Sequence, residues 1–268
     1  MGSEMCIRDS LDSDDEAKPC FLESLYKSIK DSGSDLVVCG FERVRVEDGV
    51  VLSREFCNQR DTITINSDPG AIISINPAPW NKLFKKAFLS NAFDFPYSPV
   101  MFDDLCLLLL ALCEVDKVSF VDEPLVSYFV SSNSTINSLD MSQVRDGAQA
   151  LSTAAKSVIS HIDISSKQSY VDAFSAMAFI HLGVSMTLRL SLNGLLDKDA
   201  SYEIKKLLDV QFPSWKRNQY FKFAYCLSHG GIYIKAYLSY IMYRIGLISL
   251  FLRVYRLITE SINIDIKW

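Results

Sequence analysis

The sequence predicts an α/β fold over residues 11–138, followed by an all-α region over residues 139–268. Three observations support this division. Strand-like apolar runs flank the turn sequence Asp48-Gly49, which is typical of a hairpin. Apolar residues between 117 and 130 follow a strand pattern, and from Asp140 onward only helical periodicity is found. Hydrophobic residues make up 49% of the 268, enough for a sizeable core.

The mixed region begins with a predicted helix and ends with predicted strands. Gly33 is expected to stop the first helix, because glycine readily adopts the left-handed conformation found there. The elements expected after residue 10 are a helix over 17–30, a strand from 35 followed by the hairpin, irregular chain over 57–79, a short strand passing into a helix over 80–89, an apolar helix over 102–115, and two strands over 117–121 and 125–130 separated by Glu123-Pro124.

Helices are expected over 140–161, 166–193, 199–210, 214–228 and 231–260. In the last of these, several polar and basic residues fall within an arc of roughly 100° on a helical wheel. They are Lys235, Ser239, Gly246, Ser249, Arg253 and Arg256. Charges keep every uncharged run below the roughly 18–20 residues of a membrane span. The pattern predicts a helix lying on an anionic membrane surface, and the alternative is a helix packed on its own domain.

Composition excludes some classes of protein. A net charge of −5 argues against a nucleic-acid binder that relies on overall positive charge. Seven scattered cysteines without a Cys-x-x-Cys pair, and three histidines remote from them, argue against a zinc site and fit reduced cytosolic thiols. Residues 1–10 have no apolar run of the signal-peptide kind and match nothing that follows, so we expect them to be foreign to the fold.

An acidic cluster, Asp12-Ser13-Asp14-Asp15, is the first motif with possible chemistry. Two carboxylates in an Asp-x-Asp spacing can share one Mg²⁺ or Mn²⁺, which prefer oxygen ligands and substrate phosphates. Such a metal neutralises a departing diphosphate. Taken alone, the cluster is more typical of a helix cap on a solvated turn.

Two further motifs follow. Asp103 and Asp104 open an apolar helix, where a carboxylate can accept a proton from a hydroxyl nucleophile; helix capping is again the alternative. Trp80, Asn81 and Lys82 combine an aromatic face, an amide and an ammonium group, which suits binding of a sugar. The alternative for this stretch is a core tryptophan beside surface lysines.

The order of these motifs resembles that of bacterial family-2 glycosyltransferases of the GT-A type. In this chain the motifs are followed by Val121-Asp-Glu-Pro-Leu-Val-Ser-Tyr-Phe129 and Asn133-Ser-Thr-Ile136, and the resemblance covers about residues 11–138. Members of the family build capsule, exopolysaccharide and lipopolysaccharide sugars. The resemblance implies an inverting transfer from a nucleotide sugar, with a UDP-sugar favoured, to a saccharide or lipid-linked acceptor at the cytoplasmic face of the inner membrane.

The resemblance also implies site residues. It places Asp12 and Asp14 at the metal, Asp104 with its neighbour Asp103 at the catalytic base, and Trp80, Asn81 and Lys82 near the donor sugar and acceptor.

Two departures from the family pattern stand out. No basic residue follows Phe129, where the family usually has one. The family's nucleotide-binding half has no counterpart before Leu11, so we expect a partial GT-A (Rossmann-like) sheet lacking its N-terminal nucleotide-binding strands, inactive as it stands. Two alternatives remain open: a non-catalytic membrane-associated helical interaction protein, and a degenerate transferase acting as a scaffold.

Overall fold

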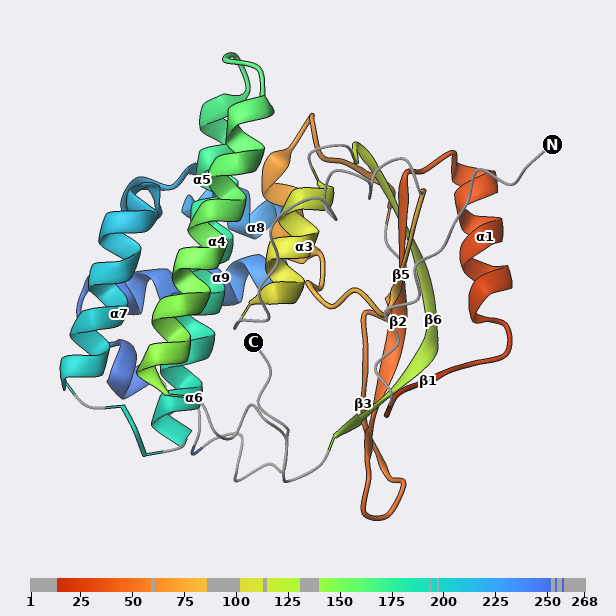
Figure 1. Cartoon of the computed structure of the whole chain (residues 1–268), viewed down its shortest axis with the longest axis horizontal. Helices are drawn as coiled ribbons and strands as arrows, with labels where there is room; N and C mark the ends of the chain where they lie inside the picture. The colour runs from red at the N-terminus through yellow and green to blue at the C-terminus, as the bar shows by residue number, and fades with distance from the viewer. Residues whose placement is uncertain are drawn as a thin grey trace. The chain divides into compact units, whose positions relative to one another are not determined.

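The computed structural model describes residues 14–58, 61–85, 102–112, 115–130, 140–192, 194–196, 198–251, 254 and 257 (Figure 1). The chain divides into two compact units, each described by itself below. The first, which we call the sheet unit, comprises Met1–Ala71, Ile75–Pro99 and Asp103–Ser134. The second, the helical unit, comprises Thr135–Trp268 and two short earlier segments. The predicted domain boundary at residue 138 and the predicted foreign stretch lie outside the described residues.

A six-stranded mixed sheet forms the centre of the sheet unit. Its main strand order is β1-β6-β2-β3, with β4 also paired to β6 and β5 to β2. The pair β2 and β6 is parallel, and the other pairs are antiparallel. The strands are β1 (Glu16–Ala17), β2 (Leu36–Arg45), β3 (Val51–Glu55), β4 (Ile63–Thr64), β5 (Lys82–Phe84) and β6 (Lys117–Val130).

Helix α1 (Phe21–Ser32) packs along one face of this sheet (Figure 1). Phe21, Leu25 and Ile29 recur every four residues, and all three are buried against β2 and β6. Gly33 ends the helix at φ 68° and donates its amide to Ile29, as predicted. The predicted start at residue 17 was wrong, because residues 16 and 17 pair with β6 instead.

The predicted hairpin is confirmed between β2 and β3. Asp48 Oδ1 accepts the amide of Val50 at 3.1 Å, and Arg45 pairs with the same carboxylate at 2.9 Å. Gly49 has φ 69°, which glycine adopts without strain. All the contacts that set this turn are local in sequence.

Strand β6 is continuous where two strands were predicted. The sheet accommodates Pro124 with an irregularity: the partner of Cys39 is Val121, whereas the partner of Gly40 is Pro124. Gly40 permits this close approach, since a Cβ there would lie 2.5 Å from Cys57 Sγ and 3.0 Å from the carbonyl oxygen of Glu123. Proline therefore shifts the register of the strand instead of ending it.

The helical unit has an aromatic core. Phe179 stacks on Trp215 with ring centroids 5.5 Å apart, and Phe221 and Tyr243 meet Phe179 edge-on. The elements are α4 (Met141–His161), α5 (Lys167–Ala178), the π-helical η4 (Phe179–Met186), α6 (Thr187–Leu192), α7 (Lys198–Gln211), the 3-10 helices η5 (Pro213–Arg217) and η6 (Gln219–Phe221), α8 (Phe223–His229) and α9 (Gly231–Arg244).

The predicted amphipathic helix over 231–260 is not continuous. Helix α9 ends at Arg244, and Gly246 follows in the left-handed region at φ 75°. Ser239, placed on the polar arc from the sequence, is fully buried together with Tyr233 and Tyr243. The polar arc therefore does not form one solvent-facing stripe along α9.

One continuous helical stretch, Lys167–Ser191, is long and apolar enough to cross a membrane by length and composition alone; no other does among the residues described. Most of this stretch, 89% of its most apolar window, is buried inside the protein. A buried core helix of a soluble protein passes the same test, so the finding is weak evidence for a span.

Candidate active site

The ring of Trp80 lies in the core of the sheet unit. It is 7% exposed, stacks on Tyr128 of β6 at 5.2 Å between ring centroids, and meets Phe41 of β2 edge-on at 4.8 Å. These contacts match the alternative of a core tryptophan more closely than an open sugar platform. Trp80 thereby fixes the end of β6 against β2.

Asn81 and Lys82 are buried beside it and joined by hydrogen bonds. Asn81 Nδ2 donates to the carbonyl oxygen of Cys39 at 2.8 Å, and the amide of Cys39 donates to the carbonyl of Asn81 at 2.9 Å. Lys82 Nζ donates to Asn81 Oδ1 at 2.8 Å and to the carbonyl of Ala78 at 2.5 Å. The pair thus bridges β2 and β5 with polar groups inside the fold, where such groups need partners.

Burial lowers the pKa of Lys82 to about 7. Interactions with Cys39 and, to a smaller extent, with Asp104 oppose part of this shift, so the predicted base lies within electrostatic range of the buried amine. A lysine with a pKa near 7 exchanges its proton at neutral pH and can act as a donor or an acceptor. Perturbed groups of this kind concentrate at functional sites, although structural networks also produce them.

Asp103 and Asp104 open helix α3 (Asp103–Ala111) as predicted. Asp103 Oδ1 accepts the amide of Asp104 at 2.9 Å, and Asp104 is exposed at the helix start. The preceding residue, Phe102, has φ 70°, an unusual conformation for a residue with a side chain. Strained backbone of this kind is often found beside functional groups.

The acidic cluster is described only from Asp14 onward, because Asp12 lies outside the described residues. Asp14 is exposed. Asp15 is 7% exposed, and its Oδ1 accepts the amide of Phe129 at 3.0 Å. The acidic cluster and the Trp80 stretch therefore both meet β6 at the adjacent residues Tyr128 and Phe129.

These contacts involve residues that sequence reasoning did not single out. From the sequence, Tyr128 is placed on a strand and in a motif of the family resemblance, and Asp15 in an acidic cluster, without a role in the site for either residue. The aromatic character of Tyr128, at the end of a predicted strand, is the only signal for it in the sequence. Its stacking on Trp80 depends on sheet register, which the local sequence does not report. Nothing in the sequence separates Asp15, which is buried, from Asp14, which is exposed.

Of the two predicted metal ligands, the structure describes one, Asp14. Among the described residues, no group of three or more His, Cys, Asp or Glu side chains could hold a metal ion. Asp14 is available to a cation as an exposed oxygen donor, whereas Asp15 is engaged with the backbone of β6. A site of one or two aspartates would need substrate phosphates to complete the coordination of Mg²⁺ or Mn²⁺.

Comparisons with known proteins bear on the fold. No protein-family model matches the chain, and no curated protein matches it. Among solved structures, the chain is similar to a crystal structure of Staphylococcus aureus TarS 1–349 in complex with UDP-GlcNAc. The TM-score is 0.59 at 16% sequence identity, covering 88% of this chain and 67% of that one. At this identity the likeness shows the fold, which is GT-A-like: a mixed α/β sheet followed by a helical C-terminal region.

Proposed function

We propose that this chain is part of an inverting family-2 glycosyltransferase that takes its sugar from a nucleotide-diphosphate donor. The observation that carries the proposal is the likeness to a glycosyltransferase structure holding UDP-GlcNAc, over 88% of the chain. The motif order supports it independently, because it was recognised from residues alone. A UDP-sugar is the donor we favour, and a hydroxyl of a bacterial cell-surface saccharide or lipid-linked sugar is the acceptor.

In this proposal Asp104 is the base. It is exposed at the start of α3, so an acceptor hydroxyl can approach it, and it would remove the proton as the oxygen attacks the anomeric carbon. Lys82 lies in its electrostatic field and holds Asn81 in place, which favours a positioning role for both. Trp80 supports the site through Tyr128, because its own ring is covered.

Asp12 and Asp14 are the proposed ligands of Mg²⁺ or Mn²⁺. When bound, the metal would neutralise the negative charge that develops on the leaving diphosphate. Asp15 contributes by fixing the acidic segment to β6 through the amide of Phe129. This anchoring keeps Asp14 beside the strand that also contacts Trp80.

The experiment that tests this proposal measures donor binding and turnover separately. UDP-GlcNAc and other UDP-sugars are titrated by calorimetry into a purified protein that contains this chain together with the family's nucleotide-binding half, with Mn²⁺ or with EDTA, and UDP release is measured in parallel. Asp14→Asn should weaken Mn²⁺-dependent donor binding at least tenfold. Asp104→Asn should leave binding within twofold and lower UDP release by about 10²–10⁴-fold.

Asp199→Asn is the matched control, since Asp199 is also an exposed acid in the first turn of a helix. It should change neither quantity. Full UDP release by Asp104→Asn would refute the assignment of the base. Absence of Mn²⁺-dependent binding for every UDP-sugar would refute the donor class and favour a degenerate scaffold.

We also propose a location at the cytoplasmic face of the inner membrane. The helical unit exposes several large apolar side chains on α8 and α9, among them Phe223, Leu227 and Leu238. Exposed apolar groups on helices are typical of proteins that bind a membrane surface or another protein. A membrane location would bring the enzyme to lipid-linked acceptors.

A further inference from the structure

A hollow of about 800 Å³ lies on the helical unit, and none of its lining residues is considered above for sugar transfer. It is formed by the start of α5, by η5 and η6, and by the residue that precedes α8. Its charged and amide side chains are Gln168, Asp172, Lys216, Arg217, Gln219 and Lys222. Three cations against one acid make it an electropositive site in a chain whose net charge is −5.

The acid in this hollow is already engaged. Asp172 is 6% exposed and accepts Nε2 of Gln168 at 2.8 Å. Lys216 pairs with Asp209 of α7 at 2.9 Å. Within the described part of the chain, Arg217 and Lys222 have no carboxylate at ion-pair distance, so their charges are available to an anion. Lysine and arginine side chains placed together in this way suit a phosphate group.

The backbone that carries the cations is held in place. Trp215, in the middle of η5, is fully buried and donates Nε1 to Asp209 at 3.0 Å. From α9, the hydroxyl of Tyr240 and the guanidinium of Arg244 both donate to the carbonyl of Lys216, at 2.8 and 2.5 Å. A fixed backbone lowers the conformational entropy that is lost when an anion binds. These bonds also connect the hollow directly to α9.

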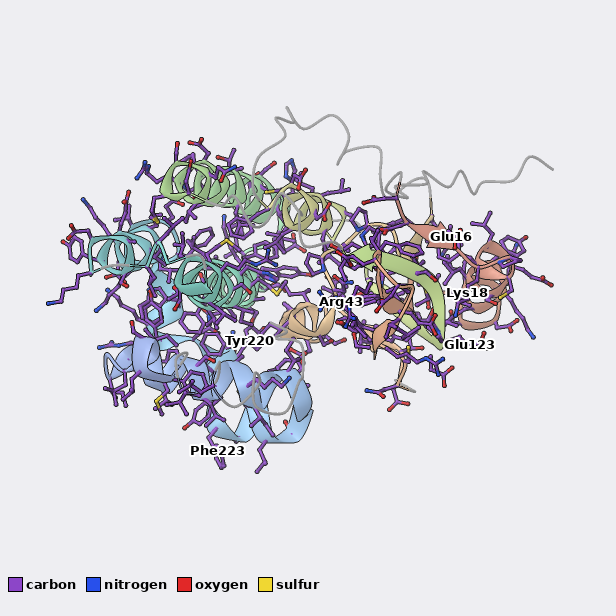
Figure 2. The ribbon with its side chains drawn as sticks, turned by 90° about the horizontal axis from the view of Figure 1, so that it is seen from below. Glu16, Lys18, Arg43, Glu123, Tyr220 and Phe223 are labelled. Carbon is purple, nitrogen blue, oxygen red and sulfur yellow. The ribbon has the colours of Figure 1, made fainter. Side chains whose placement is uncertain are left out.

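An apolar surface begins where the hollow ends. Phe223 follows Lys222 directly and is 60% exposed, and Leu227, one turn later on α8, is 59% exposed. Figure 2 shows Phe223 at the periphery of the helical unit. Phe223 also meets Tyr237 of α9 at 5.6 Å between ring centroids, which joins the two helices.

Helix α9 continues this surface with Ile234 and Leu238, and Ile245 follows at its C-terminal cap; the three are exposed and spaced by four and seven residues. At about 100° per residue they share one face, with Lys235 on one side of it and Arg244 on the other. The buried side chains of α9 lie on the opposite face. An outward apolar stripe bordered by cations is the pattern of a helix lying at a lipid headgroup boundary.

We propose that the hollow binds the phosphate of an anionic phospholipid, while the exposed side chains of α8 and α9 enter the interface of the same membrane. Arg217 and Lys222 supply the charge, and Phe223 and Leu227 supply the apolar contact. Free phosphate would contact the cations but not the adjoining apolar side chains. A phospholipid would contact both, through its phosphate and its acyl chains. The inference deepens the proposed membrane location and does not depend on sugar transfer.

Vesicle flotation tests this assignment with the whole chain. Vesicles of phosphatidylglycerol and phosphatidylcholine should bind the protein, and vesicles of phosphatidylcholine alone should not. Arg217→Glu with Lys222→Glu should weaken binding at least tenfold. The matched control is Lys205→Glu with Lys206→Glu, which makes the same charge change on exposed residues of α7 and should cost less than threefold. Equal losses in the two pairs would overturn the site, because general charge attraction would then explain binding.

A fluorescence measurement tests whether the exposed apolar side chains of α8 enter the membrane, and it keeps a large apolar side chain at position 223. Phe223→Trp should shift its emission to the blue on addition of phosphatidylglycerol vesicles and should be quenched by brominated lipid. No shift while the vesicles still bind would show that α8 stays outside the membrane and would overturn the inference. Binding of inorganic phosphate or glycerol phosphate as tight as binding of vesicles would identify a soluble ligand instead. Mn²⁺-dependent UDP-sugar binding should be equal in all these variants, so failure here leaves the proposed enzymatic function standing.

Discussion

The two units bury different kinds of side chain. The sheet unit encloses polar groups: Asn81 is fully buried, Lys82 is 5% exposed, and Glu42, at 8%, pairs with Lys18 and Arg54. The helical unit also buries polar side chains, but most of them are serine or threonine hydroxyls, with Asp172 and Asn218, set among aromatic rings and aliphatic side chains. Enclosing a polar group costs free energy unless it is fully hydrogen-bonded, whereas enclosing an aromatic ring is favourable.

This difference predicts that substitutions in the two units will have different effects. Of these polar groups, Glu42 lies on β2 and Lys82 on β5, and Asn81 and Lys82 are among the residues proposed for the site. The helical unit has its unusual features on the outside: exposed apolar side chains, and the cations Arg217 and Lys222, which have no carboxylate at ion-pair distance among the residues described. We therefore expect substitutions in the helical core to affect folding, and substitutions among the polar groups of the sheet unit to change its response to pH.

The largest effect is expected from Trp215→Ala. This ring is 1% exposed and stacks on Phe179, so its removal leaves a cavity and takes away one of the hydrogen-bond donors of Asp209. A loss of about 3–5 kcal/mol in the free energy of unfolding is expected. Urea denaturation followed by circular dichroism measures it, with Tyr202→Ala, a 70% exposed residue on α7, as the control. Equal losses in the two variants would show that the buried Trp215 ring does not stabilise the helical unit.

A smaller effect is expected from Asp35→Asn at the start of β2. Asp35 accepts the amides of Asp116 and Lys117 at 3.2 and 3.1 Å and pairs with Lys85 at 2.9 Å. Loss of these charge-assisted bonds should cost about 2 kcal/mol near pH 7.

The pH dependence sharpens this prediction. Burial by itself raises the pKa of Asp35, but the hydrogen bonds from Lys85, Lys117 and Asp116 lower it overall from its usual 3.8. The carboxylate therefore stabilises the fold above that value, and this contribution fades as the pH falls through the lower pKa of the folded state. The gap in stability between wild type and variant should narrow below pH 3.8. A gap that stays constant from pH 7 to pH 3 would contradict the prediction.

Lys82→Met should have the smallest effect at neutral pH, because relief of a buried charge opposes the loss of two hydrogen bonds. The effect of Lys82 is instead expected in how the free energy of unfolding changes with pH. With a pKa of about 7 instead of the usual 10.5, folded Lys82 binds fewer protons than the unfolded chain between these values. Wild-type stability should therefore rise as the pH increases through this range, and the variant should lose that rise. Urea unfolding at pH 7, 8 and 9 tests it, and identical slopes would show that Lys82 is solvated.

Features set by neighbouring residues could be predicted from the sequence. The turn at Asp48-Gly49, the helix stop at Gly33 and the acidic start of α3 each depend on contacts within a few positions. The mixed α/β class followed by helices was also predicted correctly, and the GT-A likeness agrees with it. Periodicity and turn chemistry carry this information.

Features set by distant partners could not be predicted. Pro124 was expected to break a strand, but the missing side chain of Gly40 on the neighbouring strand allows β6 to continue. Helix α9 was expected to run beyond Gly246, whose left-handed conformation ends it. The stacking of Trp80 on Tyr128 depends on which strands pair, and no local pattern reports that. The roles of Asp104 and Asp14 stay predictions.

The buried stretch Lys167–Ser191 has a consequence for biosynthesis. It leaves the ribosome before the residues that enclose it, since Leu208, Trp215, Phe221 and Tyr243 all come later in the chain. During that interval a nascent chain presents a segment whose length and hydropathy match those of a membrane anchor. Translation that stalls before α7 should therefore produce a species prone to aggregation or to capture by insertion machinery.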